Sequence, residues 1–311
     1  MACIAVFNQK GGVGKTTTVL SLAGMLHREG RPVLAIDLDP QGHLTTACGV
    51  EPPALEATAF AIYSRAASAS SLEVSTGCGF RLLPANSDLS CVESRFGKGP
   101  AVLARLAKSL TLEPAGRPML LDVSPRLGVL SLSSIVACDS LLVPISADFL
   151  AMQAALQMDK VLRALEPVLK RRVRRRYLIT RYDARRKLAA VVERELRQTF
   201  GAEVCETRIS ESVSLAESPA YHTDIFSHAP DSRGAQDYAS LMQELRQTDF
   251  WTPHPDAMAP RVRISVGDKQ AMERHKRLLF QSQLAKGLGL VRQRPAQTVS
   301  TGHTLNPAPA E

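Results

Sequence analysis

The residues best suited to chemistry lie in the segment 8–18, which reads NQKGGVGKTTT. Glycines in such a loop let backbone N–H groups converge on phosphate oxygens where a Cβ atom would clash. A helix that begins near Lys15 would add the partial positive charge of its N-terminus. We expect Lys15 to bind the β- and γ-phosphates of a nucleotide and the Thr16 hydroxyl to ligate Mg²⁺. The predicted phosphate-binding residues are Lys10, Gly11, Gly12, Val13, Gly14, Lys15, Thr16 and Thr17.

Carboxylates follow two further strand-like segments. Asp37 and Asp39 open the segment 37–45 (DLDPQGHLT), and Asp122 follows an apolar run. Ligands of open α/β sheets bind at the edge where parallel strands end. We therefore predict Asp37 and Asp122 as Mg²⁺ anchors and Asp39 as the residue that positions the attacking water. The alternative is that Asp37 or Asp39 only caps the following helix.

The elements that must position these residues alternate along the chain. Several apolar runs are continuous and not alternating, which is typical of strands buried on both faces. Strands are predicted at 3–7, 33–37, 80–84, 119–123, 140–145 and 177–180. Helices are predicted at 15–29, 101–110, 128–137, 149–166, 186–199 and 234–246. This alternation predicts an α/β fold of the P-loop NTPase class, a mostly parallel twisted sheet with helices on both faces.

The composition changes near residue 250. We predict a P-loop ATPase domain at 1–250, followed at 251–311 by a Pro-rich linker, a basic helix and a disordered tail. The six cysteines stand singly, which does not favour a metal site and is typical of small buried residues in a reducing compartment. The apolar N-terminus is too short for a signal peptide, and the chain has no apolar run of membrane-spanning length, so we expect a cytoplasmic protein.

The motifs together resemble the ParA/MinD family of deviant-Walker ATPases, and the ParA/Soj partition branch most closely. The resemblance covers nearly all of residues 1–246. The similar segments are KGGVGKTT (10–17), DLDPQGHLT (37–45), LLPANSDL (82–89), LLDVSPRLGVLSL (120–132), CDSLLVPISADFLAMQ (138–153), LITRYD (178–183) and SLAESPAY (214–221). Several independent motifs in one order make the resemblance specific.

The resemblance implies a role for Lys10, which has no task in an ordinary phosphate-binding loop. In the family, a lysine at this position reaches the phosphates of a partner subunit, so a homodimer forms in the ATP state. It further implies ATP and Mg²⁺ as cofactors, slow hydrolysis stimulated by an adaptor protein, and non-specific binding to nucleoid DNA. It makes Ser210 and Ser212 candidate adenine contacts. Glu211 and Ser214 replace arginines that help relatives hold DNA.

A cationic cluster offers another site for DNA. Residues 163–187 hold eleven Lys/Arg against two acidic residues, and the whole chain carries a formal charge of +8. Such a cluster can neutralise several phosphates without reading sequence. The predicted DNA-binding residues are Lys170, Arg171, Arg172, Arg174, Arg175 and Arg176. The alternatives are that this run is only a solvated surface, or that the basic stretch 268–288 binds DNA instead.

The resemblance leaves the cargo open. Partition of a plasmid or chromosome is the first expectation, and positioning of a protein cargo, such as a carboxysome or a chemotaxis cluster, is the alternative. A membrane-surface regulator of MinD type is a second class, although membrane anchoring is not expected, because a polar stretch follows the basic helix of the tail. A metabolic or metal-cluster P-loop enzyme is a third class.

Overall fold

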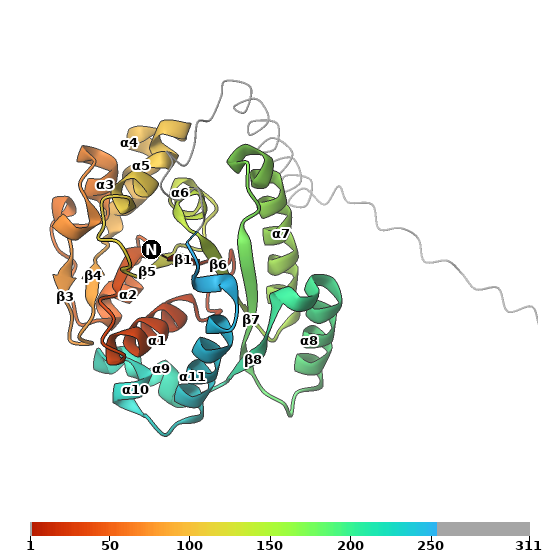
Figure 1. The fold of residues 1–311 in the computed structure, drawn as a ribbon. Coiled ribbons are helices and arrows are strands. Elements are labelled where there is room, and N and C mark those ends of the chain that lie inside the picture. The colour runs from red at the N-terminus through yellow and green to blue at the C-terminus, as the bar shows by residue number, and fades with distance from the viewer. Residues whose placement is uncertain (1, 254–311) are drawn as a thin grey trace, which may run out of the picture. The chain divides into compact units, whose positions relative to one another are not determined.

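Eight strands pair into one sheet in the computed structural model, which describes residues 2–253 (Figure 1). Their order is β3-β4-β2-β5-β1-β6-β7-β8, and all neighbours run parallel except β3 and β4. The strands are β1 (Cys3–Val6), β2 (Leu34–Leu38), β3 (Val74–Ser75), β4 (Arg81–Leu83), β5 (Met119–Val123), β6 (Ser140–Ser146), β7 (Arg174–Tyr182) and β8 (Val204–Ser210). This confirms the predicted mostly parallel sheet.

Helices cover both faces of the sheet, as the alternating pattern predicted. Helices α1, α10 and α11 gather on one face, and α5 and α6 pack together on the other (Figure 1). The longer helices are α1 (Lys15–Arg28), α5 (Pro100–Leu110), α6 (Val129–Ala137), α7 (Phe149–Leu169), α8 (Lys187–Phe200) and α11 (Arg233–Arg246). The short ones are α2 (His43–Ala47), α3 (Phe60–Arg65), α4 (Val92–Phe96), α9 (Val213–Glu217) and α10 (Ile225–His228).

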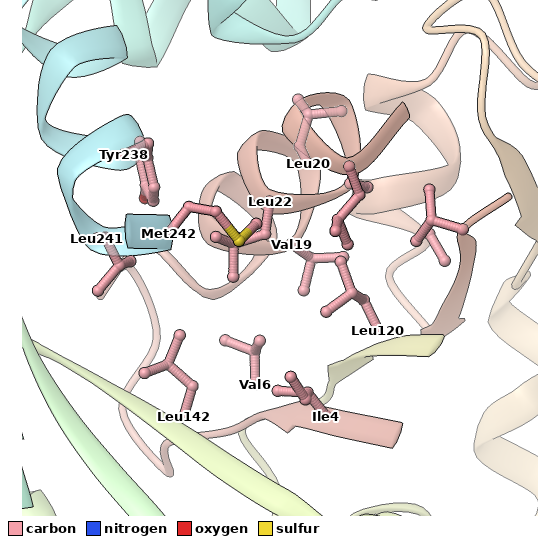
Figure 2. Packing of buried hydrophobic residues seen from close by; sticks show 14 of the residues in the cluster. Ile4, Val6, Val19, Leu20, Leu22, Leu120, Leu142, Tyr238, Leu241 and Met242 are labelled. Carbon is pink, nitrogen blue, oxygen red and sulfur yellow. The ribbon is translucent and has the colours of Figure 1, made fainter. Parts of the chain in front are cut away.

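The central core lies between β1 and the helices α1 and α11 (Figure 2). Its labelled members are Ile4, Val6, Val19, Leu20, Leu22, Leu120, Leu142, Tyr238, Leu241 and Met242, all at most 2% exposed. Full burial of such side chains contributes about 1.5–3 kcal/mol each. This packing fixes α1 over β1, and therefore fixes both ends of the loop that joins them.

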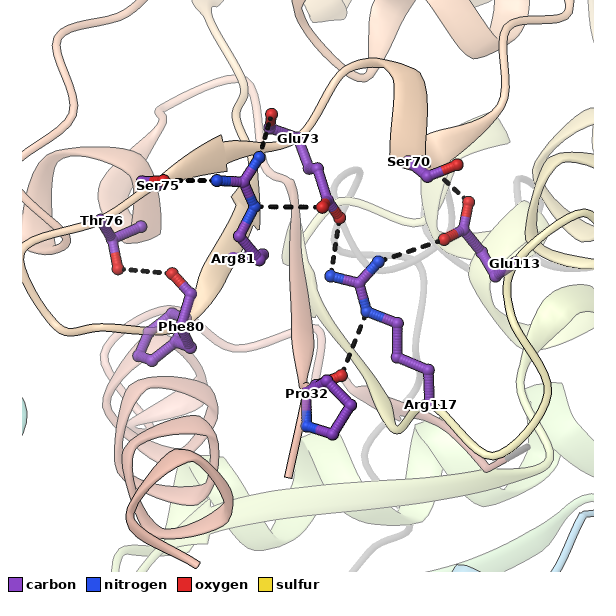
Figure 3. Close-up of polar contacts among 9 residues, drawn as sticks. All are labelled: Pro32, Ser70, Glu73, Ser75, Thr76, Phe80, Arg81, Glu113 and Arg117. Atoms are coloured by element: carbon purple, nitrogen blue, oxygen red, sulfur yellow. Dashed lines mark hydrogen bonds and ion pairs between the residues drawn. The ribbon is translucent and has the colours of Figure 1, made fainter. Parts of the chain in front are cut away.

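The amino edge of the sheet, where the parallel strands begin, is closed by ion pairs (Figure 3). The Arg117 guanidinium lies 2.7 Å from Glu73 and 3.4 Å from Glu113, and its Nε donates to the Pro32 carbonyl at 3.1 Å. Arg81 pairs with the same Glu73 at 3.0 Å. These contacts tie the β3–β4 hairpin to the residues just before β2 and β5.

The structure confirms the six predicted strands and the six predicted helices within a few residues and adds β3, β8 and the short helices. Five of the six cysteines are buried, as expected. Within residues 2–253, no helix is long and apolar enough to cross a membrane. Phe250, the last residue of the predicted ATPase domain, is fully buried. The predicted basic stretch 268–288 and the tail beyond it lie outside the described residues, and the domain division stays a prediction.

Candidate functional site

The glycine loop links the central strand β1 to α1 at the carboxyl edge of the sheet. Gly12 and Gly14 have φ angles of 72° and 84°, in the left-handed region that favours glycine. A Cβ atom placed on Gly11 or Gly12 would meet nothing within 4 Å, so the space beside them is open. No side chain caps the N-terminus of α1. Its first N–H groups are therefore available to an anion such as phosphate.

Lys15 curls back over this loop. Its Nζ donates to the Lys10 carbonyl at 2.9 Å, and its side chain is buried. Burial lowers the pKa of Lys15 below its usual value, while the carboxylates of Asp122 and Asp39 act in the opposite direction. A buried ammonium beside open backbone N–H groups is suited to a phosphate, and phosphate binding by Lys15 stays a prediction.

Thr16 and Asp122 meet across the loop. The Thr16 hydroxyl donates to the Asp122 carboxylate at 2.7 Å, although the two residues are 106 positions apart. Burial raises the pKa of Asp122 well above its usual range, and the carboxylate of Asp37, its register neighbour on β2, adds to the shift. A hydroxyl and a carboxylate in a region with excess negative charge are the oxygen donors that Mg²⁺ prefers. The residues fit a magnesium ion held by Thr16 and Asp122.

Asp37 is bound by backbone and side-chain groups of its own chain. Its Oδ2 accepts from both the backbone N–H and the hydroxyl of Thr45, at 2.9 and 2.7 Å, and its Oδ1 accepts from the Asp39 N–H at 3.0 Å. Burial raises the pKa of Asp37 to about 6, against the opposing hydrogen bonds from Thr45. Because Oδ2 binds Thr45 in α2 and Oδ1 binds the turn that precedes this helix, the geometry favours the capping alternative, and metal contact by Asp37 stays a prediction.

Asp39 does not share that capping role. Its Oδ1 accepts from the Gln41 N–H at 3.1 Å, within a tight turn, and the N-cap of α2 is Gly42 with no side-chain hydrogen bond. The side chain lies close enough to Lys15 to influence its charge. Asp39 is therefore at the carboxyl edge beside the phosphate-binding lysine, and its role in positioning water stays a prediction.

The Lys10 ammonium is bound by a residue outside its own loop. Its Nζ lies 2.6 and 2.7 Å from the two oxygens of Asp148, the residue that caps the N-terminus of α7. Burial alone would raise the pKa of Asp148, but hydrogen bonds from Lys10, Ser146 and the Ala151 N–H together lower it. Sequence reasoning missed Asp148. An acidic residue directly before a predicted helix is the signal that could have found it.

A second contact that the sequence did not reveal ties the loop to β7. The Thr180 hydroxyl donates to the Val13 carbonyl at 2.9 Å, and both residues are buried.

The candidate adenine residues lie at the end of the neighbouring strand. The Ser210 N–H donates to Asp237 at 2.8 Å, and Ser212 precedes α9 without a side-chain cap. Adenine contact by these serines stays a prediction.

The predicted DNA-binding residues, which we term the amino-edge cluster (residues 170–176), lie at the opposite edge of the sheet. Most of them are bound by the protein itself. Arg171 donates to the carbonyls of Ile135 and Cys138, at 3.3 and 2.7 Å, at the C-terminal end of α6. Arg174 donates to the Thr252 carbonyl at 2.8 Å. Arg176 donates to a backbone carbonyl as well.

Arg175 requires a correction, because its side chain is only 2% exposed. Its guanidinium lies 2.6 Å from Glu166 and 3.2 Å from Asp159, inside the domain. A buried, paired arginine cannot reach a DNA phosphate. Only Lys170 and Arg172 of the amino-edge cluster are classed as exposed, and Arg172 pairs with Glu203. Several members of the cluster therefore bind the protein itself, and DNA contact by the members other than Arg175 stays a prediction.

The geometry defines a class of protein. A glycine loop between a central parallel strand and its helix, with a lysine over the loop and a threonine facing a carboxylate, is a P-loop nucleotide-binding site. A family model described as an AAA domain matches residues 1–174.

The chain is 37% identical to the chromosome-partitioning ATPase Soj of Thermus thermophilus, over 78% of this chain and 94% of that relative. It is 31% identical to the chromosome partitioning protein ParA of Caulobacter vibrioides, over 78% of this chain and 92% of that relative. A crystal structure titled cobyrinic acid a,c-diamide synthase from Mycobacterium smegmatis, with bound ATP analogue and magnesium, is also similar. It is 28% identical, has a TM-score of 0.68, and the match covers 81% of this chain and 98% of that one. The chain belongs to the ParA/MinD family of ATPases, in its Soj branch.

Proposed function

We propose that this protein is an ATP-dependent dimerising switch that binds DNA non-specifically and partitions a cargo, with a plasmid or chromosome as the first expectation. The observation that carries this proposal is that the two lysines of the loop, Lys10 and Lys15, have different partners. Lys15 lies over its own loop, whereas the Lys10 ammonium is held by Asp148, away from that loop. A lysine that binds the nucleotide of its own subunit would not be expected to form an ion pair with another element. It is free to exchange Asp148 for the phosphates of a second subunit.

The chain's own residues supply the ATP chemistry in this proposal. The open glycine cradle and Lys15 hold the β- and γ-phosphates, and Thr16 and Asp122 hold Mg²⁺, which neutralises phosphate charge. Asp39 positions the attacking water. Two triphosphates facing each other between subunits concentrate negative charge, which the Lys10 ammonium of each subunit offsets. Hydrolysis removes part of that charge and loosens the dimer.

The remaining partners follow from this cycle. The ATP dimer binds nucleoid DNA through exposed cations. Dimerisation places two copies of these cations on one molecule, which strengthens binding. An adaptor protein on the cargo accelerates the slow hydrolysis and releases the subunits. The similarity to partition ATPases named Soj and ParA supports this assignment. The formal charge of +8 supports an anionic partner.

One experiment tests the dimer directly. Sedimentation is measured for the wild type and for Lys10→Ala, each with ADP or a non-hydrolysable ATP analogue, and retention on immobilised DNA is measured in parallel. Wild type should dimerise and bind DNA only with the analogue, and Lys10→Ala should do neither. Lys98→Ala, which removes an exposed lysine paired with Glu93, is the matched control and should behave as wild type. A wild type that stays a single copy with the analogue at high concentration would end the proposal.

The rival with some support is a metabolic P-loop enzyme, because one similar structure carries the name of a synthase. Such an enzyme consumes ATP only with its second substrate. A partition switch hydrolyses ATP slowly alone and faster with DNA and adaptor. Phosphate release measured with ATP as the sole substrate, with and without duplex DNA, distinguishes the two. Stimulation by DNA favours the switch.

A further inference from the structure

A second set of cations lies at the carboxyl edge, at the end of β7 and in the segment that follows it. These carboxyl-edge cations are Arg181, Arg185, Arg186 and Lys187. The side chains of Arg181, Arg185 and Arg186 are 58%, 91% and 66% exposed, and Lys187 is exposed as well. They differ in this from the amino-edge cluster, whose arginines mostly donate inward. The carboxyl-edge cations are therefore the group that can reach a large anion.

One carboxylate from another strand occupies two of these arginines. Glu211, the first residue after β8, lies 2.9 Å from Nη2 of Arg181 and 3.3 Å from Nη2 of Arg186. Its backbone N–H donates to the Tyr182 carbonyl at 3.1 Å, which holds it beside β7. The carboxylate is thus placed by the sheet and does not depend on a long flexible loop.

The other nearby carboxylate has a local task. Asp183 accepts from both Nε and Nη2 of Arg185, at 2.9 and 3.0 Å, and from the Arg185 N–H at 3.0 Å. Hydrogen bonds from the Arg185 side chain and backbone lower the pKa of Asp183 to about 2. Asp183 also lies 3.4 Å from Nε of Arg186. Asp183 therefore pairs with the arginines of its own turn, whereas Glu211 reaches Arg181 and Arg186 from the end of the neighbouring strand.

The carboxyl-edge cations are also joined to the phosphate loop. The Thr180 hydroxyl binds the Val13 carbonyl, and Arg181 is the next residue. Arg181 has a φ of 51°, a left-handed conformation that is uncommon for a residue with a side chain. The residue that binds the phosphate loop, Thr180, and the cation Arg181 are thus neighbours on one backbone segment.

We propose that the carboxyl-edge cations bind the phosphates of duplex DNA, and that Glu211 acts as an internal competitor that occupies Arg181 and Arg186 until phosphate replaces it. This inference rests on the proposed DNA binding and deepens it by naming the surface and its built-in opponent. Position 211 is a glutamate in this chain, so a negative charge lies among the carboxyl-edge cations.

The competition has a physical basis. Arginine pairs with carboxylate and phosphate through the same planar fork, so the two anions exclude each other from one guanidinium. An exposed pair such as Arg181–Glu211 is weak in water and exchanges readily. The competitor therefore lowers DNA affinity without abolishing it, and a chain with this feature is released more easily.

The test is DNA binding by Glu211→Gln, which keeps the side-chain shape and removes the charge. The full chain with a non-hydrolysable ATP analogue is titrated against a fluorescent 30-bp duplex over a salt series. We expect affinity to rise about tenfold near 0.1 M salt, and the slope of log K against log salt to steepen by about two, because two arginines gain phosphates. Replacing Arg181 and Arg186 by Ala in the Glu211→Gln chain should remove the whole gain.

Glu206→Gln is the matched control. Glu206 lies in β8, the strand that precedes Glu211, and it is exposed and pairs with Arg197 at 2.9 Å. Because Glu206 lies toward the amino edge, its substitution should not change DNA affinity. If Glu211→Gln binds no better than a wild type that does bind DNA, the competitor role is wrong while the proposed function stands. If the analogue-bound dimer of neither chain binds DNA, both are wrong. A gain that survives loss of Arg181 and Arg186 also overturns the inference.

Discussion

The two edges of the sheet carry similar residues and use them differently. At the amino edge, Arg117 and Arg175 are enclosed by carboxylates, and Arg171 is bound to carbonyls at the end of α6. At the carboxyl edge, Lys15 and the carboxyl-edge cations stand beside open backbone N–H groups or solvent. The number of positive charges in a segment therefore says little about its partners until the edge is known.

The direction of the parallel strands explains this difference. Helices that follow the strands begin at the carboxyl edge, so their unpaired N–H groups converge there and favour a phosphate. Helices end at the amino edge, where their last carbonyl groups attract cations from the same chain. Arg171 satisfies two such carbonyls. Arg171, just before β7, is bound to the protein in this way, whereas Arg185, after β7, is 91% exposed.

The largest expected effect lies at the carboxyl edge. Lys15→Ala should weaken ATP binding by about two orders of magnitude or more, because it removes the desolvated charge that faces the phosphates. Titration with a fluorescent ATP analogue measures this loss. Lys98→Ala, at an exposed position, should leave the affinity unchanged. Equal affinities would mean that the open glycine cradle is not the nucleotide site.

The next effect tests the amino edge. Arg175→Ala should lower the free energy of unfolding by about 3 kcal/mol, because Glu166 and Asp159 lose a buried partner. Arg172→Ala, three positions earlier and 68% exposed, should lower it by less than about 1 kcal/mol. Urea unfolding of the two variants gives the comparison. Similar small losses in both would show that the two arginines are not divided by burial.

A smaller effect is expected where the phosphate loop meets β7. Thr180→Val keeps the side-chain shape but removes the hydroxyl that donates to Val13, and should lower the free energy of unfolding by about 1 kcal/mol. Thr199→Val is a control, since that exposed hydroxyl donates to a carbonyl of its own helix. Its urea unfolding curve should match that of wild type. No loss in Thr180→Val would remove the link between the loop and the carboxyl-edge cations.

The smallest effect concerns Asp148. Asp148→Asn keeps a side-chain oxygen to cap α7 but removes the charge that holds Lys10, so stability should hardly change. The ATP dimer should form at about threefold lower protein concentration, because an exposed ion pair no longer opposes it. Analytical ultracentrifugation with an ATP analogue measures this shift. In a Lys10→Ala background the substitution should have no effect, and a persistent effect would contradict the proposed exchange.

The sequence by itself determined the parallel sheet, its long helices and the phosphate loop. Those features depend on local patterns: continuous apolar runs, helical periodicity, and glycines directly before Lys15 and Thr16. Strand β8 escaped prediction because it lies at the edge of the sheet and its residues, VCETRIS, mix charged and apolar types.

Only the tertiary structure decided which charges meet. Asp148 reaches Lys10 across 138 positions, a separation over which no local pattern carries information. The tertiary structure also binds Asp37 to Thr45 of α2 and buries Arg175, although the sequence shows both as ordinary charged residues near functional motifs. Burial and pairing depend on elements far apart in the chain, so a charge acquires its partner only when the sheet assembles.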